Sequence, residues 1–143
     1  MSSWQAIGKQ RYRVEEDVVY WEIAGEVTAA DVHAISDVTV AIHRQYGNVY
    51  VICDATRPTE FLPEARLAMR QRHEPGRAVT APSVVVGGSA VHRLLLTLVV
   101  RAIGLLGRKP PLVEFVATLS AAEQWLKGQR EQRGQRQSPD AQS

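Results

Sequence analysis

The period of the apolar pattern changes several times along the chain, and each change marks an expected element. Two extended runs, 11–14 and 18–24, flank an acidic turn and predict an N-terminal β-hairpin. The following segment repeats apolar residues at helical spacing. Thr28 and Asp31 form a capping-box pattern at its start, and Gly47 is placed to end it, so we expect one amphipathic helix here.

The rest of the chain alternates apolar runs with helical patterns. Strands are expected at 49–54, 83–86 and 113–117, and helices from Pro63 to about residue 74, from Ser89 to about residue 107, and after a capping box at Ser120 and Glu123. The segment 55–62 is expected to be a loop. The order ββαβαβαβα predicts an α/β fold with a mostly parallel five-stranded sheet, an N-terminal antiparallel hairpin and four helices.

Length and charge refine this organisation. A chain of 143 residues fits one domain, which we place at 11–127, after an N-terminal extension at 1–10. The segment 128–143 has Ala141 as its only aliphatic residue, so we expect a disordered polar tail. The net charge of +2 divides into −5 through residue 64 and +7 beyond it. Such a dipolar molecule can steer a charged partner.

Composition excludes several classes of protein. The single cysteine, Cys53, cannot form an intramolecular disulfide or supply a cysteine-ligated zinc site. The four histidines lack metal-ligand spacing, so no metal and no cofactor is expected. No stretch has signal-peptide character or the roughly 18 apolar residues of a membrane span. We therefore expect a cytoplasmic protein without a transmembrane segment.

Three stretches carry a family resemblance. The strand ending in Asp54, the junction SVVVGGSAVHRLL and the closing EFVATLSAAEQWL resemble the STAS-like (SpoIIAA-like) group over 11–127. The most specific matching residues are Phe115, Ala122, Trp125 and Leu126. The group includes bacterial anti-sigma-factor antagonists and is related in fold to the CRAL-TRIO lipid-binding domains. The resemblance therefore implies a bacterial regulatory domain.

The phosphorylation motif of those antagonists does not match. Leu62, Pro63 and Glu64 stand where the family has Asp, Ser and Ser, so the usual phosphoserine switch is absent as written. Phosphorylation of Thr59 or Ser89 stays open on the sequence alone. The resemblance thus implies binding of a protein partner without the usual phosphorylation cycle.

Ligands of parallel sheets bind beyond the carboxyl ends of the strands, and polar or glycine residues cluster there in this sequence. The candidate binding residues are Asp54, Thr56, Arg57, Thr59, Gly87, Gly88 and Ser89. Asp54 is either a functional acid or a side chain that binds loop amides. Gly87 and Gly88 either present N–H groups to an anion or form an ordinary tight turn before a helix capped by Ser89.

Catalysis is not expected at this edge. The GGSAV sequence lacks the second glycine of a nucleophile elbow, because Val91 replaces it. His92 is the only histidine after Ser89 and lies one turn along the same predicted helix, so a triad cannot form. We therefore expect a non-enzymatic protein.

The predicted helix from Ser89 has one polar row, which contains Arg93 and Arg101, and is otherwise apolar. Its apolar surface is wider than packing on one sheet face requires. Three kinds of contact would cover this surface. Neighbouring elements of the same chain could pack on it, or a homodimer or protein partner could bind it. The third is an apolar ligand or a membrane surface, with the arginines reaching headgroups. Arg93 and Arg101 join the candidate binding residues.

The resulting hypothesis is a bacterial regulatory or scaffolding module that binds a protein partner through the strand ends and this helix. The alternative is a carrier or sensor of a lipid-like ligand under the helix at 91–106. Nucleic acid is not an expected partner, because the basic residues near Arg66 and Arg70 lack interleaved aromatic residues.

Overall fold

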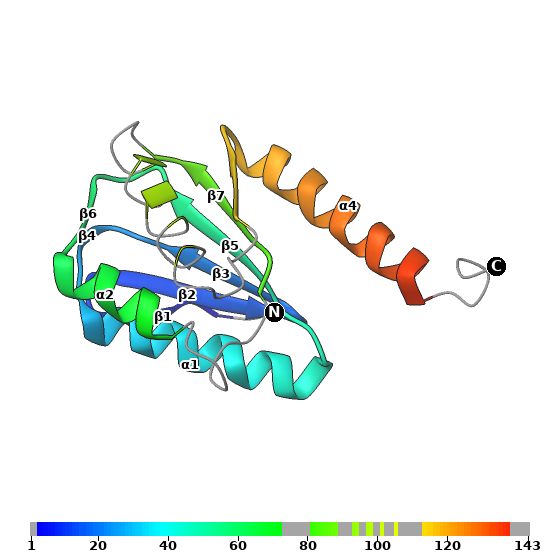
Figure 1. The fold of residues 1–143 in the computed structure, drawn as a ribbon, viewed down its shortest axis with the longest axis horizontal. Helices are drawn as coiled ribbons and strands as arrows, with labels where there is room; N and C mark the ends of the chain where they lie inside the picture. The colour runs from blue at the N-terminus through cyan, green and yellow to red at the C-terminus, as the bar shows by residue number, and fades with distance from the viewer. Residues whose placement is uncertain are drawn as a thin grey trace.

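The computed structural model describes residues 3–72, 81–88, 93–94, 97–98, 101, 105 and 113–137. Its elements are shown in Figure 1. In chain order they are β1 (Gln5–Ile7), β2 (Gln10–Glu15), β3 (Val18–Glu22), β4 (Gly25–Val27), α1 (Ala29–Tyr46), β5 (Tyr50–Ala55), β6 (Thr59–Phe61), α2 (Pro63–Gln71), β7 (Ser83–Gly87), β8 (Val113–Val116) and α4 (Leu119–Gln137).

The main sheet is mixed and mostly parallel. Its strand order is β1-β2-β3-β5-β7-β8; the first three strands are antiparallel neighbours, and β3, β5, β7 and β8 run parallel. The α/β class and the hairpin formed by β2 and β3 are confirmed. The expected helix from Ser89 lies largely outside the described residues, although positions 93, 94, 97, 98, 101 and 105 have helical backbone.

The expected five strands were too few. The main sheet has six strands, and β4 and β6 form a separate two-stranded sheet within segments without a predicted strand. The extension expected at 1–10 contains β1 and the start of β2. Strands β1, β4 and β6 have three residues each, which is too short for an alternating pattern, so only their pairing with other strands defines them.

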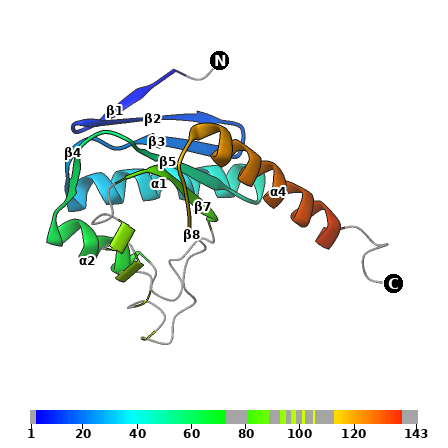
Figure 2. The ribbon, with the colours of Figure 1, turned by 90° about the horizontal axis from the view of Figure 1, so that it is seen from above.

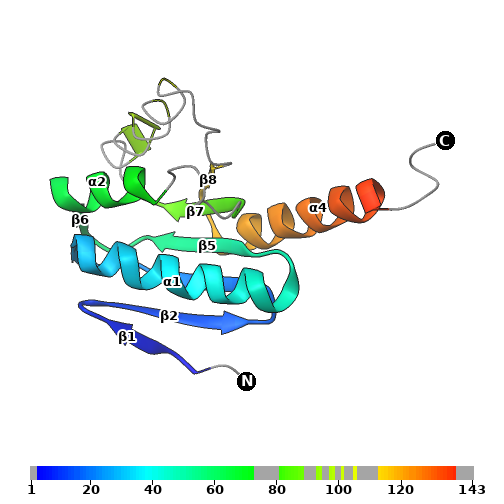
Figure 3. The same ribbon diagram turned by 60° about the horizontal axis from the view of Figure 1, so that its bottom comes forward.

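Helices cover the two faces of the sheet unequally (Figures 2 and 3). Helices α1 and α2 pack on one face around a large core that includes Val19, Ile23 and Phe61. Among the described helices, α4 alone packs on the other face, where the buried residues are Val18, Tyr50, Ile52, Val84, Val86, Ala122 and Leu126. The alternation of side chains along β3 explains how one strand serves both cores.

Helix α1 begins and ends where the sequence predicts. Thr28 Oγ1 accepts the Asp31 N–H at 3.2 Å, and the Asp31 carboxylate accepts the Thr28 N–H at 2.9 Å. Gly47 ends the helix with φ of 80°. Buried Asp31 also accepts a hydrogen bond from Gln10 Nε2 at 3.0 Å, and Gln10 Oε1 accepts the Trp21 Nε1–H at 3.0 Å. This network joins β2 and β3 to the start of α1.

Helix α4 extends into the segment expected to be disordered. It continues to Gln137, so the predicted disorder from Gly128 is wrong as far as that residue. Residues 138–143 lie outside the described residues. Arg130 explains the extension, because its guanidinium pairs with Asp17 and lies 5.9 Å from the Tyr50 ring centroid. The helix starts at the Thr118 hydroxyl, which accepts the Ala121 N–H at 3.1 Å, and not at the predicted Ser120 cap.

Candidate functional site

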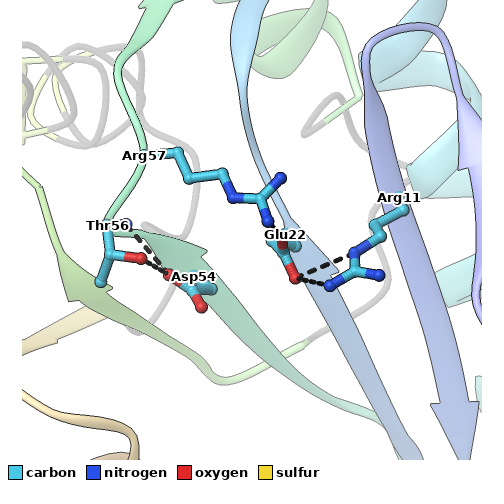
Figure 4. A network of polar contacts seen from close by, with 5 residues as sticks. All are labelled: Arg11, Glu22, Asp54, Thr56 and Arg57. Atoms are coloured by element: carbon cyan, nitrogen blue, oxygen red, sulfur yellow. Dashed lines mark hydrogen bonds and ion pairs between the residues drawn. The ribbon is translucent and has the colours of Figure 1, made fainter.

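The carboxyl ends of β3, β5 and β7 lie at one edge of the sheet and define the rim of the candidate site. In the parallel register of β3 and β5, Glu22 pairs with Asp54, so both side chains project from the same face. Figure 4 shows these two carboxylates with Arg11, Thr56 and Arg57 around them. The network drawn in Figure 4 thus contains two acidic and two basic side chains.

Glu22 is the centre of the charged network. Its side chain is only 10% exposed, and its Oε2 accepts a hydrogen bond from Arg11 Nε at 3.1 Å and forms an ion pair with Arg11 Nη2 at 2.9 Å. Its other oxygen, Oε1, lies 3.0 Å from Arg57 Nη2. That contact is an ion pair without hydrogen-bond geometry. A buried carboxylate therefore holds two arginines on the surface.

Asp54 fixes the loop after β5. Its Oδ1 accepts the Thr56 N–H at 3.0 Å and the Thr56 hydroxyl at 2.6 Å. This is the loop-amide role that the sequence left as one of two alternatives. Thr59 is buried in β6 and donates its hydroxyl to the Arg57 carbonyl at 2.9 Å. Both contacts shape the segment from which Arg57 projects.

The glycines after β7 allow a close approach of two strand ends. Gly87 and Gly88 have φ of 72° and 86°, values that residues with a side chain rarely adopt. A Cβ atom on Gly87 would lie 2.8 Å from Thr56 Cγ2. Gly87 is therefore needed for the end of β7 to pass the loop that contains Thr56.

The remaining candidate residues divide between two places. Arg93 lies at the rim, where its Nη2 is 3.4 Å from the Gly87 carbonyl oxygen and its guanidinium is 6.0 Å from the Phe115 ring centroid. Arg101 is exposed and, among the described residues, makes no contact with the network of Figure 4. Ser89 lies outside the described residues. The structure thus brings Asp54, Thr56, Arg57, Thr59, Gly87, Gly88 and Arg93 to one end of the sheet.

Sequence reasoning missed Arg11 and Glu22. Both read as ordinary strand residues, because their contact depends on the antiparallel register of β2 and β3, in which they are direct partners. The one available signal was Glu22 as the single charged residue within the otherwise apolar run at 18–24. The central carboxylate of the site therefore appears only when the strands are paired.

Other chemistry at the rim is limited. Within the described parts of the chain, no group of three or more His, Cys, Asp and Glu residues could hold a metal ion. Burial, with a smaller contribution from Asp54, raises the pKa of the Cys53 thiol to about 12. Cys53 is thus a protonated core residue, and a protonated thiol is a poor nucleophile.

The exposed cations of the rim can bind an anionic group. The Arg57 side chain is 58% exposed and the Arg11 side chain 45%, and each guanidinium carries five N–H donors. The bonds to Glu22 use only some of those donors. Arg11 and Arg57 can therefore bind a carboxylate or phosphate while Glu22 holds them in position.

Comparison with known proteins gives no further guide. No family model matches the sequence, and no curated protein matches it. Among the described residues, no helix is both long enough and apolar enough to cross a bilayer. The contacts of the rim are therefore the basis for assigning a function.

Proposed function

We propose that this chain is a STAS-like domain that acts as a non-enzymatic regulatory or scaffolding module and binds a protein partner in the bacterial cytoplasm. Two features support this assignment. Antiparallel N-terminal strands precede four parallel strands, the arrangement that the resemblance implies, despite the additional strands. Ala122 and Leu126, which carry part of that resemblance, are buried residues of α4 that pack against the sheet.

The contact surface in this proposal is the rim, and the exposed arginine pair held by Glu22 is the observation that carries it. A buried carboxylate pairs with both guanidinium groups and restricts their movement, which lowers the entropy lost when they bind. Arginine is favoured at protein interfaces because its planar group forms paired hydrogen bonds with carboxylates. The partner is expected to present an acidic side chain to Arg57.

Chemical cross-linking followed by affinity capture tests this function with three full-length proteins: wild type, Arg57→Glu and Arg44→Glu. Arg44 is an exposed residue of α1, so its substitution matches the charge change away from the rim. A partner captured by wild type and Arg44→Glu but lost with Arg57→Glu supports the rim as its binding site. Equal capture by all three proteins contradicts it.

A second candidate function is carriage or sensing of a lipid-like ligand beneath the segment 91–106. Exposed Leu94, Leu98 and Leu105 favour it, because a segment that gates an apolar ligand exposes leucines when the ligand is absent. Native mass spectrometry of the full chain distinguishes the candidates. A small-molecule mass that disappears on denaturation supports the carrier, and a bare protomer or dimer excludes a stably bound ligand.

A further inference from the structure

Three leucines with helical backbone are exposed on the side of the molecule remote from β1. Leu94 is 59% exposed, Leu98 50% and Leu105 88%. Together with exposed Arg101, their positions are separated by three or four residues, or by seven, which is the spacing of one helix face. Figures 2 and 3 show the described fragments of this segment beside α2 and away from β1. We call Leu94, Leu98, Arg101 and Leu105 the leucine–arginine surface.

The sequence on either side of these leucines has charge of one sign. The sequence from 75 to 113 contains no acidic residue and five basic ones: Arg77, Arg93, Arg101, Arg108 and Lys109. Arg93 and Arg101 are both exposed in the structure. The leucines therefore lie in a stretch that attracts anions.

We propose that the leucine–arginine surface binds peripherally to an anionic lipid bilayer. Leucines on one face enter the boundary between headgroups and acyl chains, while arginines extend their apolar stems and keep their charge among lipid phosphates. This inference concerns a different surface from the rim and goes beyond the proposed partner binding.

Charge complementarity selects this occupant over a second copy of the chain. In a twofold dimer the same patch lies on both sides of the interface, so exposed Arg101 would approach the equivalent arginine. The segment has no acidic residue to neutralise such a pair. A bilayer with anionic headgroups supplies the missing charge and the apolar layer together.

The extreme exposure of Leu105 favours a fluid surface over a rigid protein partner. A side chain that is 88% exposed projects from the molecule and makes few contacts with it. Protein anchors usually enter a complementary pocket and are surrounded by residues that exclude water. A projecting leucine gains equal burial in acyl chains without any such match in shape.

Vesicle co-sedimentation tests the proposal with the full chain. The vesicles contain either phosphatidylcholine alone or equal parts of phosphatidylcholine and phosphatidylglycerol. We expect binding to the anionic vesicles, weak binding to the neutral ones, and loss of binding at about 1 M salt, where charges are screened beyond about 3 Å. Arg101→Gln should weaken binding about fivefold, and Leu105→Gln about tenfold.

Matched variants separate this surface from general effects. Leu119→Gln removes an exposed leucine, 47% exposed, from the start of α4, and Arg44→Gln removes an exposed charge from α1. Both controls should bind anionic vesicles as wild type does. The proposal is wrong if wild type does not sediment with anionic vesicles, if neutral vesicles bind it equally, or if the controls weaken binding as much as the test variants.

Sedimentation velocity of the same proteins tests the competing occupant of this surface, a second copy of the chain. A wild-type dimer that Leu105→Gln dissociates, with no vesicle binding, assigns the surface to a second copy and overturns the proposal. Failure of vesicle binding leaves the rim untouched, because cross-linking through Arg57 is measured without lipid. Circular dichroism of each variant verifies that loss of binding is not loss of folding.

Discussion

Glycine residues at two positions have positive φ for different reasons. Gly47 ends α1 with φ of 80°, and nothing lies within 4 Å of a Cβ built there. Gly87 has φ of 72°, and its Cβ would lie 2.8 Å from Thr56 Cγ2. Alanine at the first position meets only backbone strain, whereas alanine at the second also meets a side chain of the rim.

We therefore expect Gly47→Ala to lower the free energy of unfolding by about 1 kcal/mol, and Gly87→Ala to lower it by about 1–3 kcal/mol more. Urea unfolding measures both. Adding Thr56→Ser to Gly87→Ala removes Cγ2 and keeps the hydroxyl that binds Asp54, so part of the loss should be recovered. Equal losses in the two single variants, with no recovery in the double variant, would mean that the close approach does not limit this position.

The thiol of Cys53 gives a prediction for alkaline pH. Burial raises its pKa from the ordinary value of 9.0 to about 12, so between these values the folded chain keeps a proton that the unfolded chain releases. The free energy of unfolding must then fall as pH rises through this interval. Desolvation also raises the pKa of Tyr20, which acts in the same direction. Comparison with Cys53→Ala isolates the contribution of the thiol.

Urea unfolding of both proteins at several pH values above 9 measures the difference. The wild type should lose stability with pH more steeply than Cys53→Ala does. At about pH 8 the folded thiol should react with a thiol reagent only as fast as the chain opens, because its thiolate fraction is about one in ten thousand. Parallel pH curves for the two proteins, or rapid thiol labelling of the folded chain, would show that Cys53 is not buried as described.

At the scale of secondary-structure elements, the sequence predicted the features that depend on contacts between nearby residues. It missed those that depend on contacts between residues far apart in the chain. The caps of α1 use residues three or four positions apart, so Thr28, Asp31 and Gly47 could be identified from the sequence. Strand β6 pairs with β4, which lies more than thirty residues earlier, and its three residues contain no pattern of their own. The rule that ligands bind at strand ends located Asp54 and Arg57, but Arg11 and Glu22 required the register.

Helix α4 shows the same limit at its far end. The segment 128–137 has no apolar stripe, and Gly128 and Gly134 each disfavour helix by about 1 kcal/mol. Composition therefore predicts disorder. The ion pair from Arg130 reaches Asp17, which is far away in the sequence, and this contact explains the additional helical turns.

We expect Arg130→Ala to reduce the helicity of this segment. Hydrogen exchange of the amides at 128–137 should become faster, because the variant loses both the ion pair with Asp17 and the contact with the Tyr50 ring. Gly134→Ala should have the opposite effect and slow exchange, because it removes a residue that disfavours helix. A Cβ at this position meets nothing within 4 Å, so the substitution adds no clash. If Arg130→Ala leaves the exchange rates unchanged, the contact with Asp17 does not hold the helix.

At the scale of the whole molecule, the sheet has two cores of unequal size. Helix α1 has 18 residues and buries Val32, Ile35 and Ile42 in the larger core, which α2 also covers. Helix α4 has 19 residues but contributes only Ala122 and Leu126 as buried residues of the smaller core. The two helices are nearly equal in length but differ in how many of their residues are buried, so they should differ in local stability.

Native-state hydrogen exchange tests this asymmetry. We expect the amides of α4 around Leu126 to exchange through an opening of lower free energy than those of α1, since α4 can leave the sheet without disturbing the larger core. Leu126→Ala should cost about 2–5 kcal/mol and lower the protection of α4 first. Ile42→Ala weakens the larger core, so it should lower the protection of both helices. If both substitutions change both helices equally, the two cores unfold as one unit and α4 does not open independently.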